Sequence, residues 1–173
     1  MPPRKRRIPV VFDTNVIVGF YLSRSPGSAN QQAFRLWRDQ RQLQLIVSDD
    51  VVREYLEVLF RLGVPEALVK RLEKRFANRI TVTHVSLGLR PKLSRDPDDN
   101  IMIATARSGK ASFLVTNDRD LLEISPRVQA RLRLEIYYAC RTLGADTSKL
   151  RSEIESHFSG PPPSFACDCT LMI

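Results

Sequence analysis

The chain has 173 residues, 43% of them hydrophobic, which is enough for one globular domain with a buried core. Lys and Arg total 27 against 19 Asp and Glu, and the formal net charge of +8 favours contact with nucleic acid or another anionic surface. No apolar run approaches the roughly 18 residues of a membrane helix, and 3 cysteines are too few for a disulfide framework. We therefore expect a soluble, cytoplasmic protein.

Apolar runs and helix-capping signals predict the elements of the first third of the chain. Residues 8–12 form a short apolar run that is typical of a buried central strand, and a helix is expected after Asp13. Ser28 and Gln31 have the spacing of a capping box, which predicts a second helix. Residues 43–47 are expected to form the second strand.

The middle of the chain is predicted to hold two helices and a strand. Ser48 is the expected cap of a helix that ends at Gly63, and Pro65 is expected to open another helix through about Ala77. The apolar face of the first of these helices comprises Val51, Val52, Tyr55, Leu56, Leu59 and Phe60. Residues 80–83 alternate as a third strand.

The remaining elements complete an α/β pattern. After a loop over 84–95, a helix is expected to begin at Asp96 and to end at Gly109. Residues 112–115 are the predicted fourth strand, a short helix follows, and the alternation over 131–137 predicts an edge strand. Strands separated by helices imply a three-layer α/β/α fold with a central, mostly parallel five-stranded sheet.

Composition changes near the C-terminus and divides the chain into three segments. We expect one main domain over 8–138, a helical extension over 139–159 that contains an amphipathic helix at 146–158, and a flexible tail over 160–173. The tail begins with Gly-Pro-Pro-Pro, which breaks regular structure.

Carboxylates occur where the predicted strands end and where a helix begins. Asp13 follows the first strand, Asp118 follows the fourth, and Asp99 lies in the first turn of the helix after the third. Residues beyond the carboxyl ends of parallel strands converge in one crevice, so these three acids are expected to meet there. Helix capping is the alternative role for Asp118 and Asp120, and it is the main role we assign to Asp96.

Converging carboxylates need compensation. Two of them about 4 Å apart repel by roughly 4 kcal/mol at an effective dielectric of about 20. The compensation can be a cation, a shared proton or a basic partner such as Lys110 or Arg119. A Mg²⁺ or Mn²⁺ ion suits the site better, because hard cations prefer oxygen ligands.

Glu54 is the fourth candidate ligand. It lies at the border of the apolar face of its helix, whereas Glu57 points further outward and can pair with Arg61 at the i, i+4 spacing. A solvated helix glutamate remains the alternative reading of Glu54.

Other chemistries have less support, since the chain has 2 histidines and lacks a zinc-protease motif, a Gly-rich phosphate loop and a nucleophile elbow.

These motifs resemble those of the PIN domain family of metal-dependent ribonucleases, which are frequent in toxin–antitoxin pairs. The resemblance covers residues 8 to about 138 and is carried by four motifs. They are the apolar strand into Asp13-Thr14-Asn15, the helix that carries Glu54, the segment Asp-Pro-Asp-Asp99-Asn100, and the strand into Thr116-Asn-Asp118-x-Asp120. The match is nearest to the subgroup of toxins with the Asp-Pro-Asp-Asp-Asn form.

The resemblance implies roles for individual residues. Asp13, Glu54, Asp99 and Asp118 are the implied metal ligands, and Asp120 replaces or supplements Asp118. Asn15 is implied to shape the site, and Thr116 to position a water or a phosphate oxygen. Candidate residues for the RNA backbone are Arg24, Arg35, Arg38, Lys70, Arg71, Lys92 and Arg95, and an ordinary solvated surface charge is the favoured alternative for most of them.

The sequence thus predicts an endoribonuclease that uses Mg²⁺ or Mn²⁺ and acts as the toxin of a toxin–antitoxin pair. A homodimer and a small antitoxin partner are implied by the resemblance alone. The competing hypotheses are a housekeeping RNA-processing nuclease, a catalytically silent RNA- or partner-binding module, and a phosphohydrolase with a nucleophilic aspartate. Asn15 disfavours the last, because such enzymes carry a second acid at that position.

Overall fold

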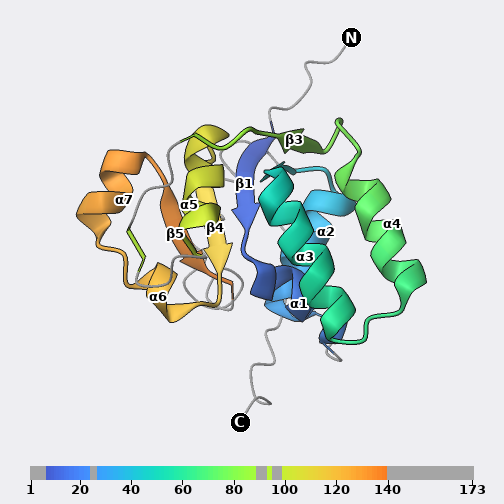
Figure 1. Ribbon diagram of the computed structural model, residues 1–173. Coiled ribbons are helices and arrows are strands. Elements are labelled where there is room, and N and C mark those ends of the chain that lie inside the picture. The colour runs from blue at the N-terminus through green and yellow to red at the C-terminus, as the bar shows by residue number, and fades with distance from the viewer. Residues whose placement is uncertain (1–6, 24–26, 89–92, 95–98, 140–173) are drawn as a thin grey trace.

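The computed structural model describes residues 7–23, 27–88, 93–94 and 99–139 (Figure 1). Its sheet has the strand order β3-β2-β1-β4-β5, and every neighbouring pair is parallel. The strands are β1 (Ile8–Phe12), β2 (Leu43–Val47), β3 (Val82–His84), β4 (Phe113–Thr116) and β5 (Glu135–Tyr138). The predicted five-stranded α/β fold is confirmed, with a sheet that is parallel throughout.

Helices flank this sheet and connect its strands (Figure 1). They are α1 (Thr14–Leu22), α2 (Ala29–Arg38), α3 (Asp49–Arg61), α4 (Glu66–Phe76), α5 (Asp99–Ser108), α6 (Arg119–Leu122) and α7 (Pro126–Leu132). Strand β1 is central and fully apolar, with Val10, Val11 and Phe12 buried. Helix α5 carries the chain from the β3 edge to β4 and packs against β1, β2 and β4.

Two predicted helix caps form, with one difference in detail. The Ser48 side chain accepts a hydrogen bond from the Val51 N–H at 3.3 Å, and the Ser28 side chain accepts one from the Gln31 N–H at 3.4 Å. The capping box at Ser28 is incomplete, because the Gln31 side-chain amide donates to the Ser23 carbonyl at 3.4 Å. Gly63, with φ of +74°, follows α3 in a left-handed conformation that suits glycine.

The third strand and the outer face of α3 differ from the prediction. The strand runs over Val82–His84, and Ile80 lies before it with 65% of its surface exposed. The Asn78 side chain accepts a hydrogen bond from the Ile80 N–H at 2.9 Å, so this segment is a turn. Phe60, assigned to the apolar face of α3, is 69% exposed, because that face is narrower than the hydrophobic pattern suggested.

The predicted edge strand begins later than expected. Residues 131–132 end α7, a helix that the sequence analysis did not identify, and β5 runs over Glu135–Tyr138. Between them Arg133 adopts φ of +53°, which ends the helix and redirects the chain. The alternation of Arg and Leu was misread as strand because it begins inside a helical turn.

Several sequence predictions lie outside the described residues. These are the helix start at Asp96, the extension beyond Ala139, its amphipathic helix at 146–158 and the tail over 160–173. The domain boundaries therefore stay predictions. None of the helices in the described segments has the length and apolar content to cross a membrane.

Candidate metal centre

The carboxyl ends of β1 and β4 define the candidate site. These two strands are parallel neighbours, with Phe12 opposite Val115. Strand β2, the next in sequence, lies on one side of β1, and β4 lies on the other. Such a reversal of strand order leaves a crevice beyond the strand ends, where parallel α/β folds hold ligands. Asp13 follows β1 and Asp118 follows β4, so the topology brings both acids to this crevice.

Asp13 is held from both strands. Its side chain is buried, with the residue 6% exposed. The carboxylate oxygen Oδ2 accepts a hydrogen bond from Asn15 Nδ2 at 2.5 Å and another from the Thr116 hydroxyl. The Asp13 N–H continues the strand ladder by donating to the Val115 carbonyl at 2.9 Å. The carboxylate is therefore fixed before any ligand binds.

Burial raises the pKa of Asp13 to about 6 from its ordinary value of 3.8. Hydrogen bonds from the Thr116 side chain and the Thr14 backbone oppose this change, and the negative charges of Asp99 and Asp118 add to it. The two acids predicted to join Asp13 thus act on it electrostatically. A carboxylate in this situation is stabilised by a cation.

Asn15 and Thr116 connect the two strand ends. Asn15 Oδ1 accepts a hydrogen bond from the Asn117 N–H at 3.0 Å while its amide nitrogen binds Asp13. The Thr116 hydroxyl donates to Asp13 and accepts from the Asp118 N–H at 2.8 Å. Thr116 is fully buried, so in this geometry its hydroxyl orients a carboxylate and a loop. Its implied contact with water or phosphate stays a prediction.

Three half-buried carboxylates, which we call the acidic trio, gather beside this frame. Asp99, Asp118 and Asp120 each offer an oxygen that lies within 4.8 Å of the other two. The Asp118 side chain also caps α6 by accepting from the Asp120 N–H at 2.8 Å. Asp118 therefore both caps α6 and lies in the acidic trio, so its capping role does not remove it from the cluster.

The start of α5 is tied to the preceding segment. The Ser94 hydroxyl donates to Asp99 Oδ2 at 2.8 Å, and Asn100 Oδ1 accepts from the N–H groups of Leu93 and Ser94 at 2.8 and 3.0 Å. Asn100 is buried. These contacts set the direction of Asp99. Asn100 was predicted only as part of the acidic motif, and its role in holding the segment before α5 was not predicted.

Glu54 is joined to the same region through Thr14. The Thr14 hydroxyl donates to Glu54 Oε1 at 2.5 Å, and the neighbouring Tyr55 hydroxyl donates to the Phe12 carbonyl. The first bond attaches α3 to the start of α1, and the second attaches it to the last residue of β1. Glu54 is half-buried whereas Glu57 is exposed, in agreement with the choice between them. Tyr55 was predicted only as a core residue, and a buried tyrosine needs such a polar partner.

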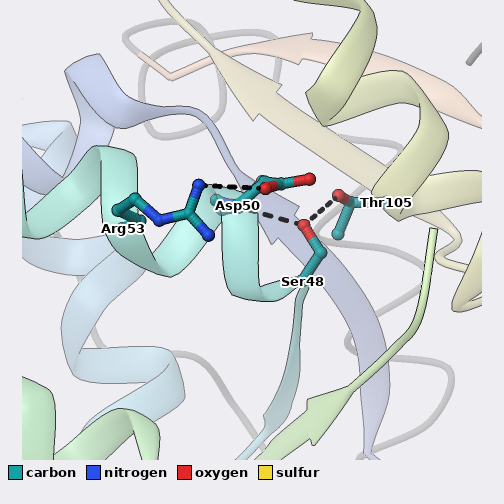
Figure 2. A network of polar contacts seen from close by, with 5 residues as sticks. Ser48, Asp50, Arg53 and Thr105 are labelled. Carbon is teal, nitrogen blue, oxygen red and sulfur yellow. Dashed lines mark hydrogen bonds and ion pairs between the residues drawn. The ribbon is translucent and has the colours of Figure 1, made fainter.

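A buried hydroxyl pair attaches α3 to α5 (Figure 2). Ser48 Oγ and Thr105 Oγ1 lie 2.9 Å apart, and Ser48 also caps α3. The nearby ion pair of Asp50 with Arg53 spans 3.2 Å and lies on the outer side of α3. Because α3 carries Glu54 and α5 carries Asp99, the Ser48–Thr105 contact fixes two candidate ligands relative to each other.

The donor set fits a hard divalent cation. Carboxylates supply every candidate ligand, and two charges 4.8 Å apart repel by roughly 3 kcal/mol at an effective dielectric of about 20. Lys110 and Arg119 form no ion pair with the trio within the described part of the chain. A Mg²⁺ or Mn²⁺ ion suits these oxygen donors, because hard cations prefer oxygen ligands.

Comparisons with known proteins show the family of this chain. A comparison with curated protein sequences found no match. Among solved structures, VapBC2 from Rickettsia felis bound to a DNA fragment from its promoter is similar, with 14% identity and a TM-score of 0.49. That match covers 75% of this chain and 99% of the other. The family model of the PIN domain matches residues 9–120, which include the whole candidate site, and the chain therefore belongs to the PIN domain family, whose members are generally nucleases.

Proposed function

We propose that this protein is an endoribonuclease that depends on Mg²⁺ or Mn²⁺ and hydrolyses RNA phosphodiester bonds. The observation that carries the proposal is the acidic trio next to a buried, hydrogen-bonded Asp13 at the switch point of the sheet. Family membership supports hydrolysis of nucleic acid. The net charge of +8 supports a polyanionic substrate.

In this mechanism Asp13, Glu54, Asp99 and Asp118 are the ligands, and Asp120 supplements Asp118. A bound divalent cation lowers the pKa of a water molecule and neutralises charge on the phosphodiester. Thr116 and Asn15 hold Asp13 in one orientation, so little reorganisation is needed when the substrate arrives. Thr14 holds Glu54 in the same way. No side chain has to become a covalent nucleophile.

A cleavage assay tests the proposal. Purified protein is incubated with single-stranded RNA and Mg²⁺ or Mn²⁺, and EDTA is expected to abolish cleavage. The Asp99→Asn variant is expected to be inactive, and Asp49→Asn is the matched control because its carboxylate is 93% exposed and outside the trio. Wild-type protein that binds Mn²⁺ without cleaving RNA is instead the catalytically silent module considered above.

The biological setting is a further part of the proposal. The Asp-Pro-Asp-Asp99-Asn100 motif supports a toxin that is inhibited by a small antitoxin, and a homodimer in the cytoplasm accompanies this role. Induction of the chain in a bacterial host is expected to arrest growth, and co-expression of a small protein encoded next to it is expected to relieve the arrest. Normal growth on induction of a catalytically active chain identifies a housekeeping nuclease.

A further inference from the structure

Four arginines gather on the side of the molecule formed by α2 and α4. We call them the arginine surface: Arg35 and Arg38 in the last turn of α2, and Arg71 and Arg75 one turn apart on α4. The two helices are locked together by Trp37 and Phe76, whose rings stack with centroids 5.9 Å apart. Both rings are buried, so the arginines project from a rigid base.

Two neighbouring groups show that these charges are close together. The positive charges of Arg75, Arg38 and Arg71 act on the Tyr21 hydroxyl, whose pKa is raised because burial outweighs them. Arg38, Arg75 and Arg35 likewise act on Asp39, whose pKa is lowered mainly by its hydrogen bonds to Arg38. Arg38 and Arg75 affect both groups, which connects all four arginines into one surface.

The surface carries an excess of positive charge. Arg38 is paired with Asp39, with Nε and Oδ1 2.6 Å apart. Arg35, Arg71 and Arg75 form no ion pair within the described segments. The negative ends of the helix dipoles favour basic residues in a last turn, which accounts for Arg35, Arg38 and Arg75 but not for Arg71.

Two aromatic rings lie beneath Arg38. Phe20 and Phe34 stack with centroids 3.7 Å apart, and the Arg38 guanidinium lies 5.7 Å from each ring centroid. Phe34 is buried and Phe20 half-buried, so these rings support Arg38 from the core side. Together with its bidentate bond to Asp39 they hold the guanidinium in one orientation. Beside it, the half-buried Tyr21 offers a hydroxyl donor. Guanidinium groups bind phosphates and stack on the bases of single-stranded nucleic acid.

We propose that the arginine surface binds the single-stranded RNA substrate beyond the scissile phosphodiester, an inference that rests on the proposed function. Helix α1 connects the two places, since Asp13 immediately precedes it and Tyr21 lies near its end. The eight residue steps from Asp13 to Tyr21 span about 12 Å along the helix, which is the length of roughly three to four stacked nucleotides. The strand thus runs along α1 from the acidic crevice to the arginines.

The experiment compares two double variants that remove the same charge. Arg71→Gln with Arg75→Gln changes the arginine surface, and Arg127→Gln with Arg131→Gln is the matched control at the same i, i+4 spacing on α7. Figure 1 shows α4 and α7 at opposite ends of the sheet. Binding of a long single-stranded RNA is measured with EDTA over a range of salt concentrations, and circular dichroism verifies that both variants are folded.

The variant on α4 is expected to bind the long RNA about tenfold more weakly, and its plot of log affinity against log salt is expected to be less steep by about 1.4, for two lost phosphate contacts. With Mg²⁺, its KM for long RNA is expected to rise while kcat stays unchanged. Cleavage of a dinucleotide, which is too short to reach α4, is expected to stay at the wild-type rate.

Equal RNA binding by the α4 and α7 variants overturns this inference, even if the wild-type protein is an active ribonuclease. It is also overturned if the α4 variant loses only its binding to polyglutamate, because the surface then recognises an acidic polypeptide. Absence of any RNA cleavage by the wild-type protein is a different result, since it contradicts the proposed function itself.

Discussion

Asp13 and the acidic trio face the same crevice but are held by different kinds of contact. Asp13 is buried, and its oxygen Oδ2 is bound by Asn15 and Thr116. The trio is half-buried, and its three carboxylates face one another within 4.8 Å. One region is thus a single carboxylate fixed by hydrogen bonds, and the other is a cluster that brings three carboxylate oxygens close together. This difference predicts distinct consequences for stability and activity.

The largest expected effect comes from Asp13→Asn. Cleavage is expected to fall by more than about a thousandfold, equivalent to roughly 4 kcal/mol of lost transition-state stabilisation. The metal-free variant is nevertheless expected to be more stable than wild type at pH 8, by up to about 3 kcal/mol, because it avoids ionising a buried carboxyl group.

The stability gain of the metal-free Asp13→Asn variant is expected to depend on pH in a characteristic way. The folded-state pKa of about 6 lies above the ordinary value of 3.8, so the contribution of Asp13 to stability is full below pH 3.8 and is lost as the pH rises through 6. The difference between wild type and Asp13→Asn in urea unfolding with EDTA is therefore expected to be small near pH 4 and constant above pH 7. A pH-independent difference contradicts the assigned cause.

The acidic trio is expected to respond most to metal. Mn²⁺ at 100 times its dissociation constant stabilises a one-site protein by about 2.7 kcal/mol, and this gain is expected in thermal unfolding of the wild type. Asp99→Asn is expected to remove most of it, whereas Asp49→Asn retains it because that carboxylate is exposed. An equal gain in both variants places the cation elsewhere.

The sequence predicted the fold well because its strands and caps are local signals. Continuous apolar runs marked β1, β2 and β4 within a residue or so, and Ser48 marked the start of α3. Convergence of the acids followed from strand order alone. The errors arose at Ile80 and Arg133, where a turn and a left-handed residue interrupt the hydrophobic pattern.

The hydrogen bonds that hold the candidate site residues in place could not be predicted from the sequence. Thr14 and Tyr55 bind partners 40 and 43 residues away, and Ser48 reaches Thr105 over 57 residues. A single sequence shows the residue types but not these pairings, which depend on how α3 and α5 pack. Buried hydroxyl groups next to predicted ligands are the signal that could have suggested them, because each needs a partner.

Thr116→Val tests the rigid region without removing a ligand. The variant leaves the Asp13 carboxylate with one bond fewer and the Asp118 N–H without its acceptor. We expect cleavage to fall about 10- to 100-fold, as for other residues that orient metal ligands, and stability to fall by about 1–3 kcal/mol. Thr116→Ser is expected to restore both, and a serine variant as impaired as the valine variant argues against the hydroxyl.

The smallest effect is expected at the contact between α3 and α5. Thr105→Val keeps the shape of the side chain but leaves Ser48 without its hydroxyl partner, which is expected to cost about 1 kcal/mol in urea unfolding. Ser48 still caps α3, so the helix is expected to remain intact in circular dichroism. Because Glu54 and Asp99 lie on the two helices, Mn²⁺ affinity is expected to fall severalfold while kcat at saturating metal is retained. A stability loss with unchanged Mn²⁺ affinity assigns the Ser48–Thr105 pair to packing alone, and Thr105→Ser separates the hydroxyl from the methyl group.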